Sequence, residues 1–123
     1  MSLGIIIKAP EGMVLAAESR VTLGASIITP TGPQMINVNF DNATKVFSFN
    51  TPNSFIGAVT YGTASIGVRT AQSFIPEFES SLDTKKRLTV EDLSKKMSVF
   101  FSKQWTDAGM KLWAVLTPID AVP

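Results

Sequence analysis

The spacing of apolar residues changes once along this chain, and that change limits the folds open to it. The first half holds short runs that are β-branched or alternate with polar residues, which predicts strands at 4–9, 13–17, 45–49 and 55–59. The first two runs flank the turn residues Pro10-Glu11-Gly12 and predict an antiparallel hairpin. A run of strands followed by helices indicates the α+β class rather than alternating βαβ units.

The second half carries helical spacing. One helix is expected where apolar residues recur at intervals of three and four, at Ala64, Val68, Ala71, Phe74, Ile75 and Phe78. Pro76 should kink or shorten that helix. A second helix is expected to begin at Thr89, which with Asp92 resembles a capping box, and to end at 107–109. A last strand is expected at 111–116, and the Pro- and Gly-rich stretch 29–33 indicates a loop.

Composition excludes several classes of function. The chain has 123 residues, which fits one domain. Its 11 basic and 10 acidic residues form no basic stripe, so nucleic acid is not an expected partner. No apolar run approaches the roughly 20 residues that span a bilayer, so no membrane is expected. The chain has no Cys, which excludes disulfides and thiolate sites and fits a cytoplasmic location.

Three charged residues stand out against apolar strands. Glu18 and Arg20 close the second strand, and their even spacing puts both side chains on one face. Lys45 opens the third strand. For an arbitrary domain, the default interpretation of such charges is a solvated strand end. The chain has no His, so the usual general base near neutral pH and the commonest metal ligand are missing, and neither a metal nor another cofactor is expected.

The pattern as a whole is more specific than its parts. Gly4-Ile5-Ile6-Ile7-Lys8, followed by the segment 12–22, closely resembles the opening of proteasome β subunits and of the related HslV-type peptidases. Weaker likenesses follow in the family's order, at 44–47, 56–64, 89–93 and 112–120. The resemblance implies an N-terminal-nucleophile hydrolase, whose fold is an αββα sandwich. In this chain the sandwich is expected to be incomplete, with antiparallel sheets and two long helices on one face.

The resemblance also assigns roles to individual residues. In that family an N-terminal Thr attacks a peptide carbonyl, and its own α-amine takes the proton. Lys45 matches the buried lysine of the site and Glu18 the carboxylate that holds it charged, where the family more often has Asp. Arg20 matches a structural arginine. Thr22 matches a residue whose backbone binds extended substrate. The oxyanion donor would be the N–H of Gly57 or Ala58.

The chain departs from the family in two places. The family's nucleophile lies four residues before the glycine matched by Gly4, a position that would precede Met1. Removal of Met1 would expose Ser2, which has a hydroxyl and a free amine but lies about 6–7 Å short at strand rise. In addition, the resemblance leads us to expect that residues 1–123 form a single, truncated domain of this fold. Its uncovered apolar faces predict self-association or contact with other ring subunits.

Three functions therefore remain open from the sequence. The first is a proteasome-type β subunit resembling threonine endopeptidases, which take a peptide substrate inside a ring-shaped chamber, although the chain as written lacks the nucleophile. The second is a catalytically inactive structural ring subunit. The third is an N-terminal-nucleophile amidohydrolase that acts on a small amide.

Overall fold

In the part of the chain that the structure describes, four antiparallel hairpins and two helices form, which confirms the α+β class. The computed structural model describes residues 2–62 and 65–110. The strands of the described residues form four separate two-stranded sheets, each made of two successive strands. They are β1 (Gly4–Ala9) with β2 (Gly12–Ala17), β3 (Val21–Thr29) with β4 (Gly32–Phe40), β5 (Val46–Ser48) with β6 (Gly57–Val59), and β7 (Ser65–Ile66) with β8 (Arg69–Thr70). A 3-10 turn, η1 (Ala71–Phe74), leads into helices α1 (Ile75–Ser80) and α2 (Val90–Asp107).

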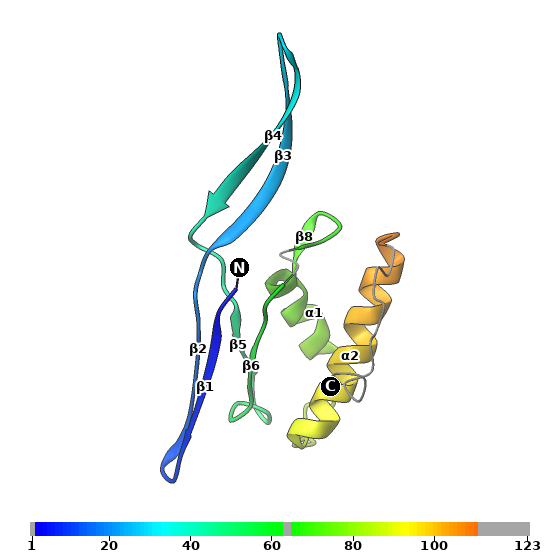
Figure 1. The fold of residues 1–123 in the computed structure, drawn as a ribbon. Coiled ribbons are helices and arrows are strands. Elements are labelled where there is room, and N and C mark those ends of the chain that lie inside the picture. Colours follow the sequence, from blue (N-terminus) through cyan, green and yellow to red (C-terminus); the bar gives the residue numbers. More distant parts are fainter. Residues whose placement is uncertain (1, 63–64, 111–123) are drawn as a thin grey trace, which may run out of the picture.

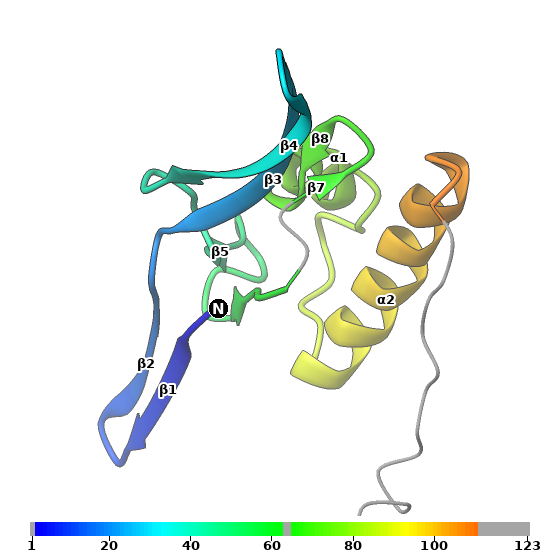
Figure 2. The same ribbon diagram turned by 45° about the horizontal axis from the view of Figure 1, so that its top comes forward.

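The elements form layers, with one hairpin projecting from them (Figure 1). Hairpin β1–β2 lies beside β5–β6, and α1 and then α2 follow on the other side of β5–β6. Hairpin β3–β4 extends away from these layers, and Figure 2 shows the same arm from above. Among the described residues, the buried core lies in the layered part and not in the arm.

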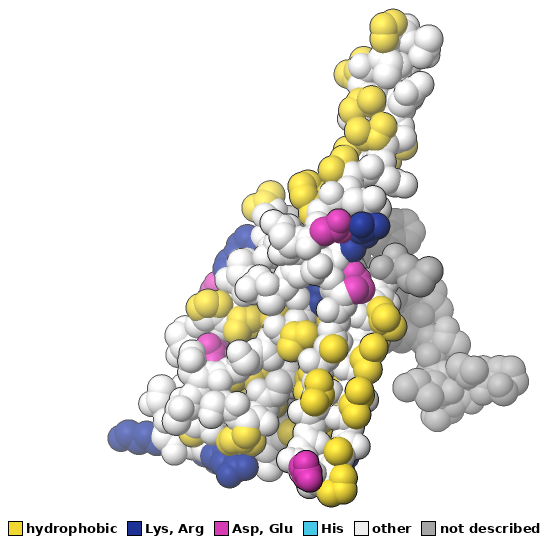
Figure 3. Space-filling view, turned by 90° about the vertical axis from the view of Figure 1, so that its left-hand side faces the viewer, with side chains coloured by type: hydrophobic (Ala, Val, Ile, Leu, Met, Phe, Trp, Pro, Cys, Tyr) yellow, Lys and Arg dark blue, Asp and Glu magenta, His cyan; other side chains and the backbone are white. Residues whose placement is uncertain are grey.

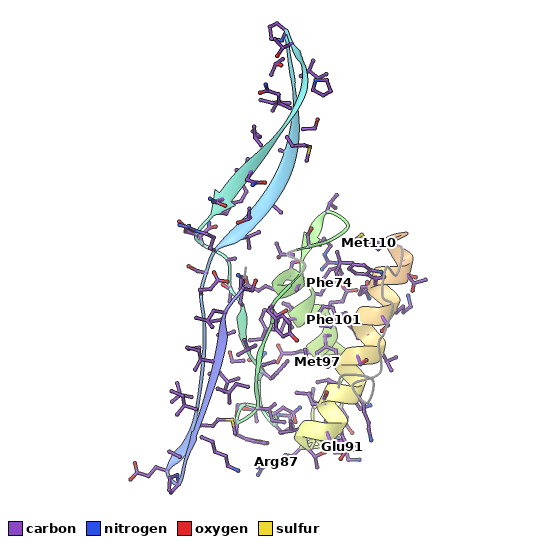
Figure 4. All side chains as sticks on the ribbon, viewed as in Figure 1. Phe74, Arg87, Glu91, Met97, Phe101 and Met110 are labelled. Carbon is purple, nitrogen blue, oxygen red and sulfur yellow. The ribbon has the colours of Figure 1, made fainter. Side chains whose placement is uncertain are left out.

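Phenylalanines connect these layers. Phe49, just after β5, packs edge-on against Phe78 of α1, with ring centroids 6.3 Å apart. Phe78 packs in turn against Phe100 of α2, at 5.4 Å. Phe74 meets Phe100 and Phe101, and Figure 4 shows Phe74, Met97 and Phe101 between α2 and the elements it covers. The phenylalanines of α1 and α2 therefore pack against one another, and Phe49 joins them from the end of β5.

Hairpin β1–β2 is confirmed where the sequence predicted it. Opposite residues of an antiparallel pair share a face, so Ile6 and Leu15 lie on one side and Ile7 and Val14 on the other. The Leu15 side chain reaches β6, where a Cβ added to Gly57 would lie 3.4 Å from it. The opposite side stays open, with Ile7 58% and Val14 60% exposed. Figure 3 shows apolar side chains gathered along this hairpin and the projecting arm.

The helix expected over 64–78 is wrong for most of its length. Residues 65–70 form the small hairpin β7–β8 instead, because Gly67 takes a positive φ of 59° at a two-residue turn. Ile66, Val68 and Thr70 are β-branched and lose side-chain freedom in a helix. The helix α1 is only six residues long and has Pro76 in its first turn, where no N–H is needed. One long helix and one short helix are therefore present in the described chain.

Hairpin β3–β4 was missing from the sequence-based prediction. The stretch 29–33 was predicted to be a loop, and its centre is indeed the turn that joins the two strands. The strands themselves carried a period-two signal, since apolar residues alternate at Leu23, Ala25 and Ile27 and again at Ile36, Val38 and Phe40. The polar residues that lie between these apolar residues made both runs resemble a loop.

The remaining predicted strands and the second helix have different outcomes. The strands expected at 45–49 and 55–59 are present but short, at three residues each. Helix α2 begins as predicted, because the Thr89 hydroxyl accepts a hydrogen bond from the Asp92 N–H at 3.1 Å. It ends before Gly109, which has a φ of 68°. The strand expected at 111–116 lies outside the described residues.

The core analysis gives a first prediction. Phe78 is 1% exposed at the junction of β5, α1 and α2, so Phe78→Ala should lower the free energy of unfolding by about 3–5 kcal/mol. Phe55→Ala is the matched control, because Phe55 is 53% exposed and should cost less than about 1 kcal/mol. Urea unfolding followed by circular dichroism measures both. Equal losses from the two variants would contradict this account of the core.

Candidate functional site

Strand alternation turns Lys45 toward the interior. Lys45, Phe47 and Phe49 are 8%, 6% and 5% exposed, while residues 46 and 48 between them are exposed. Lys45 therefore has the parity of the core residues of β5. Its carbonyl accepts a hydrogen bond from the Thr60 N–H at 2.8 Å, which extends the pairing of β5 with β6 by one step. Lys45 is therefore not a solvated strand end, which is the default interpretation of a charge at such a position.

The buried ammonium of Lys45 has two acceptors. Its Nζ donates to Glu18 Oε1 and to the backbone carbonyl of Arg20. An ammonium has three N–H donors, and a buried charge costs several kcal/mol unless it is paired and hydrogen-bonded. Two of the three donors thus have acceptors within the described part of the chain. The third is available to a group that enters from the neighbouring space.

Glu18 is positioned by the backbone on both sides. Its N–H donates to the Leu3 carbonyl at 3.2 Å, which carries the β1–β2 ladder one residue further. Its second carboxylate oxygen, Oε2, accepts from the Arg20 N–H at 2.6 Å. The hydrogen bond from Lys45 is the main cause that lowers the pKa of Glu18 below its ordinary value of 4.5, against the opposing effect of burial. Glu18 is therefore ionised near neutral pH.

Arg20 holds the base of the projecting arm. Its guanidinium makes a two-pronged contact with Asp41, Nε to Oδ1 at 2.6 Å and Nη2 to Oδ2 at 3.0 Å. The side chains of Arg20 and Asp41 are 58% and 62% exposed, so the pair adds little stability, but it joins the residues just before β3 and just after β4. It fixes the segment whose carbonyl accepts from Lys45. Sequence reasoning placed Arg20 near the site but missed Asp41.

A cavity of about 510 Å³ opens beside Lys45. Its wall comes from the chain's N-terminal segment, the base of the arm, the start of β5 and the segments after β6 and β8. The lining residues include Ser2, 20–23, Phe40, 42–45, 60–62, Ser65 and 70–72. Among the described residues, the only charged ones that line it are the cations Arg20 and Lys45. A negative group that forms in this cavity would therefore meet a positive charge.

The start of β1 is held close to this cavity. A Cβ added to Gly4 would lie 2.8 Å from Val59 Cγ1 of β6, so the backbone can approach β6 there because residue 4 has no side chain. With the Leu3 carbonyl bonded to Glu18, this contact leaves Ser2 at the cavity wall. The described structure has no hydrogen bond between the Ser2 hydroxyl and Lys45.

The structure gathers most, but not all, of the predicted site. Ser2, Arg20, Thr22 and Lys45 line the cavity, and Glu18 lies behind Lys45. Gly57 and Ala58 are not among the lining residues, because their position on β6 is occupied by pairing with β5. Gly62 lies at the cavity instead, with a φ of 91°.

Comparisons with protein-family models, curated proteins and solved structures found no match to this chain. Neither α1 nor α2, the helices of the described residues, is long and apolar enough to cross a bilayer.

The lowered pKa of Glu18 gives a second prediction. Near pH 4.5 the unfolded chain should bind more protons at Glu18 than the folded chain does. The stabilisation from Glu18 is therefore present above pH 4.5 and is lost as the pH falls through the lower folded-state pKa. Carboxyl-carbon NMR should place the Glu18 midpoint below 4.5, and Lys45→Met should move it upward.

Lys95→Met is the matched control for this titration. Lys95 pairs with Glu91 on α2 and is 71% exposed, so its loss should leave the Glu18 midpoint unchanged. A Glu18 midpoint that is the same with and without Lys45 would show that the two groups do not interact in solution.

Proposed function

We propose that this chain is a proteasome-type β subunit of the N-terminal-nucleophile hydrolase superfamily, resembling threonine endopeptidases that act inside a ring-shaped chamber. The observation that carries the proposal is the environment of Lys45. A lysine that is 8% exposed is held by a carboxylate and a carbonyl at the wall of a cavity, and the chain's N-terminal segment reaches the same wall. A buried charged group with a specific charge partner at the wall of a cavity is a candidate functional residue.

The proposed chemistry needs neither His nor Cys. The hydroxyl of an N-terminal Thr or Ser attacks the peptide carbonyl, and a C–O bond forms as the free α-amine takes the hydroxyl proton. An α-amine has a pKa of about 7.7–8.0, so a useful fraction is neutral near pH 7. The third N–H of Lys45 and its positive charge stabilise the nucleophile's oxygen as it loses its proton. Glu18 keeps Lys45 in position.

The later steps follow from the same arrangement. The tetrahedral oxyanion accepts hydrogen bonds from backbone N–H groups at the cavity wall, with Gly62 better placed than Gly57 or Ala58. The C–N bond then breaks, and the amine product leaves with the proton that the α-amine took. Water hydrolyses the ester that remains and restores the hydroxyl. The hydroxyl proton thus leaves with the amine product, and a proton from the water replaces it on the nucleophile.

Strand β3 supports a peptide as the substrate. Thr22 lies on β3 at the cavity, and its hydroxyl donates to Asn39 of β4 at 2.8 Å. Among the described residues β3 pairs only with β4, so its second edge can accept an extended peptide by strand addition. The open apolar side of β1–β2 further supports a partner, either another copy or another ring subunit. The cytoplasmic location remains part of the proposal.

The inactive ring subunit is the second candidate. It is favoured by the missing hydrogen bond between the Ser2 hydroxyl and Lys45 in the described structure. The N-terminus of the natural protein, read by mass spectrometry, separates the two candidates. A mature Thr four residues before Gly4, or a mature Ser2, supports the hydrolase. An N-terminus without a hydroxyl-bearing residue at either place supports the inactive subunit.

Activity gives the third prediction. Lys45→Ala should abolish hydrolysis of fluorogenic peptides by the natural protein, with at least about a hundredfold loss, while the circular dichroism spectrum stays unchanged. Lys95→Ala, which removes an exposed lysine on α2, should keep full activity.

Two results would overturn parts of this proposal. Undiminished hydrolysis by Lys45→Ala would remove Lys45 from the mechanism. Hydrolysis of small amides but not of peptides would instead favour the amidohydrolase.

A further inference from the structure

The arm formed by β3 and β4 has an unusual composition. Its residues, Val21 to Phe40, include no charged side chain. Both strands are nine residues long, and the hairpin projects away from the layered part of the molecule (Figure 2). A lone two-stranded hairpin is at best marginally stable in water, and uncharged unpaired edges invite association. The arm is therefore an element whose stability calls for a partner.

The two faces of the arm differ in chemistry. Opposite residues share a face, and the register pairs Leu23 with Val38, Ala25 with Ile36, and Val21 with Phe40. These residues, together with Ile27, form what we call the apolar face. The other face carries polar pairs near the base, Thr22 with Asn39 and Gly24 with Asn37. Toward the tip this second face carries the isolated apolar residues Met35 and Ile28, which are 75% and 92% exposed.

Much of the apolar face is open to solvent. Leu23 is 41% exposed, Ile27 39%, Ile36 38% and Phe40 47%. A surface that alternates so regularly would be expected to lie on a core, yet no other element of the described chain covers it along its length. An exposed, contiguous apolar strip of this kind marks an interaction surface.

We propose that the apolar face of the arm packs against the same face of the arm of a second copy of this chain, across a twofold axis. A twofold interface uses the same patch on both partners, so the patch must not repel itself. An arm without charges meets that condition. Two such ribbons packed face to face, about 10 Å apart, would form a small sandwich with a shared apolar interior.

The size of the arm limits the size of this contact. Specific interfaces use roughly 20–30 residues on each side, and one face of the segment 21–40 supplies about ten, so the contact lies at the small end of specific interfaces. A lipid surface is the less favoured occupant, because segments that lie on membranes carry Lys and Arg on their polar face and the arm has none. The proposal does not depend on the chemistry assigned to Lys45.

The test compares neighbouring isoleucines that point to opposite faces. Ile27 lies on the apolar face, whereas Ile28 lies on the other face and is 92% exposed. Ile27→Asp should raise the dissociation constant of the assembly by roughly tenfold or more, and Ile28→Asp by less than about threefold. Sedimentation of the full chain over a concentration series gives both constants.

Cross-linking tests the same face without weakening it, because the chain contains no cysteine. Ala25→Cys lies on the apolar face and Ser26→Cys on the other. A bismaleimide that reaches about 10 Å, the spacing of packed sheets, should give a cross-linked dimer with Ala25→Cys and little with Ser26→Cys. This comparison remains valid if Ile27→Asp unfolds the arm.

Three outcomes would overturn the proposal. One is a chain that stays monomeric at tens of micromolar. Another is an assembly that Ile27→Asp leaves intact together with equal cross-linking from both faces, which would put the contact on another surface. The third is a monomeric chain that sediments with phosphatidylcholine vesicles and loses that binding in Ile27→Asp, which would make lipid the occupant.

Discussion

The site depends on the burial of one positive charge. The alternation of β5 sends the Lys45 side chain inward with Phe47 and Phe49, and an unpaired ammonium there would be too costly to bury. Glu18 and the Arg20 carbonyl remove that cost, which requires the end of β2 to lie against the start of β5. The ladder bond from Glu18 to Leu3 then brings the chain's N-terminal segment to the same place.

The same contacts connect the site to the rest of the fold. Phe49 continues from β5 into the aromatic core under α1 and α2, so the strand that carries Lys45 is fixed by the packing behind it. On the other side, Arg20 and Asp41 close the base of the β3–β4 arm, and Leu23 and Phe40 form part of the cavity wall. An assembly through the arm would therefore begin at the rim of the candidate site.

The sequence predicted those elements of the fold that are determined by the local residue pattern. The β1–β2 hairpin and the Thr89 cap of α2 follow from turn residues and spacing, and Glu18 and Lys45 were paired through a family resemblance. The helix predicted for residues 65–70 was wrong because the apolar spacing was given more weight than the turn signal of Gly67. The β3–β4 arm was missed because the polar residues between its alternating apolar residues made it resemble a loop. Asp41 was missed because its partner, Arg20, lies 21 positions earlier in the chain.

Competitive labelling of lysines by an amine-reactive reagent, read by peptide mass spectrometry, tests the buried charge most directly. Lys45 is 8% exposed, whereas Lys95 on α2 is 71% exposed and makes a comparable ion pair. The account predicts that Lys45 in the folded chain reacts at least about tenfold more slowly than Lys95, and that denaturant removes the difference. Equal reactivity in the folded chain would mean that the Lys45 ammonium lies in solvent, and the proposed site would fail with it.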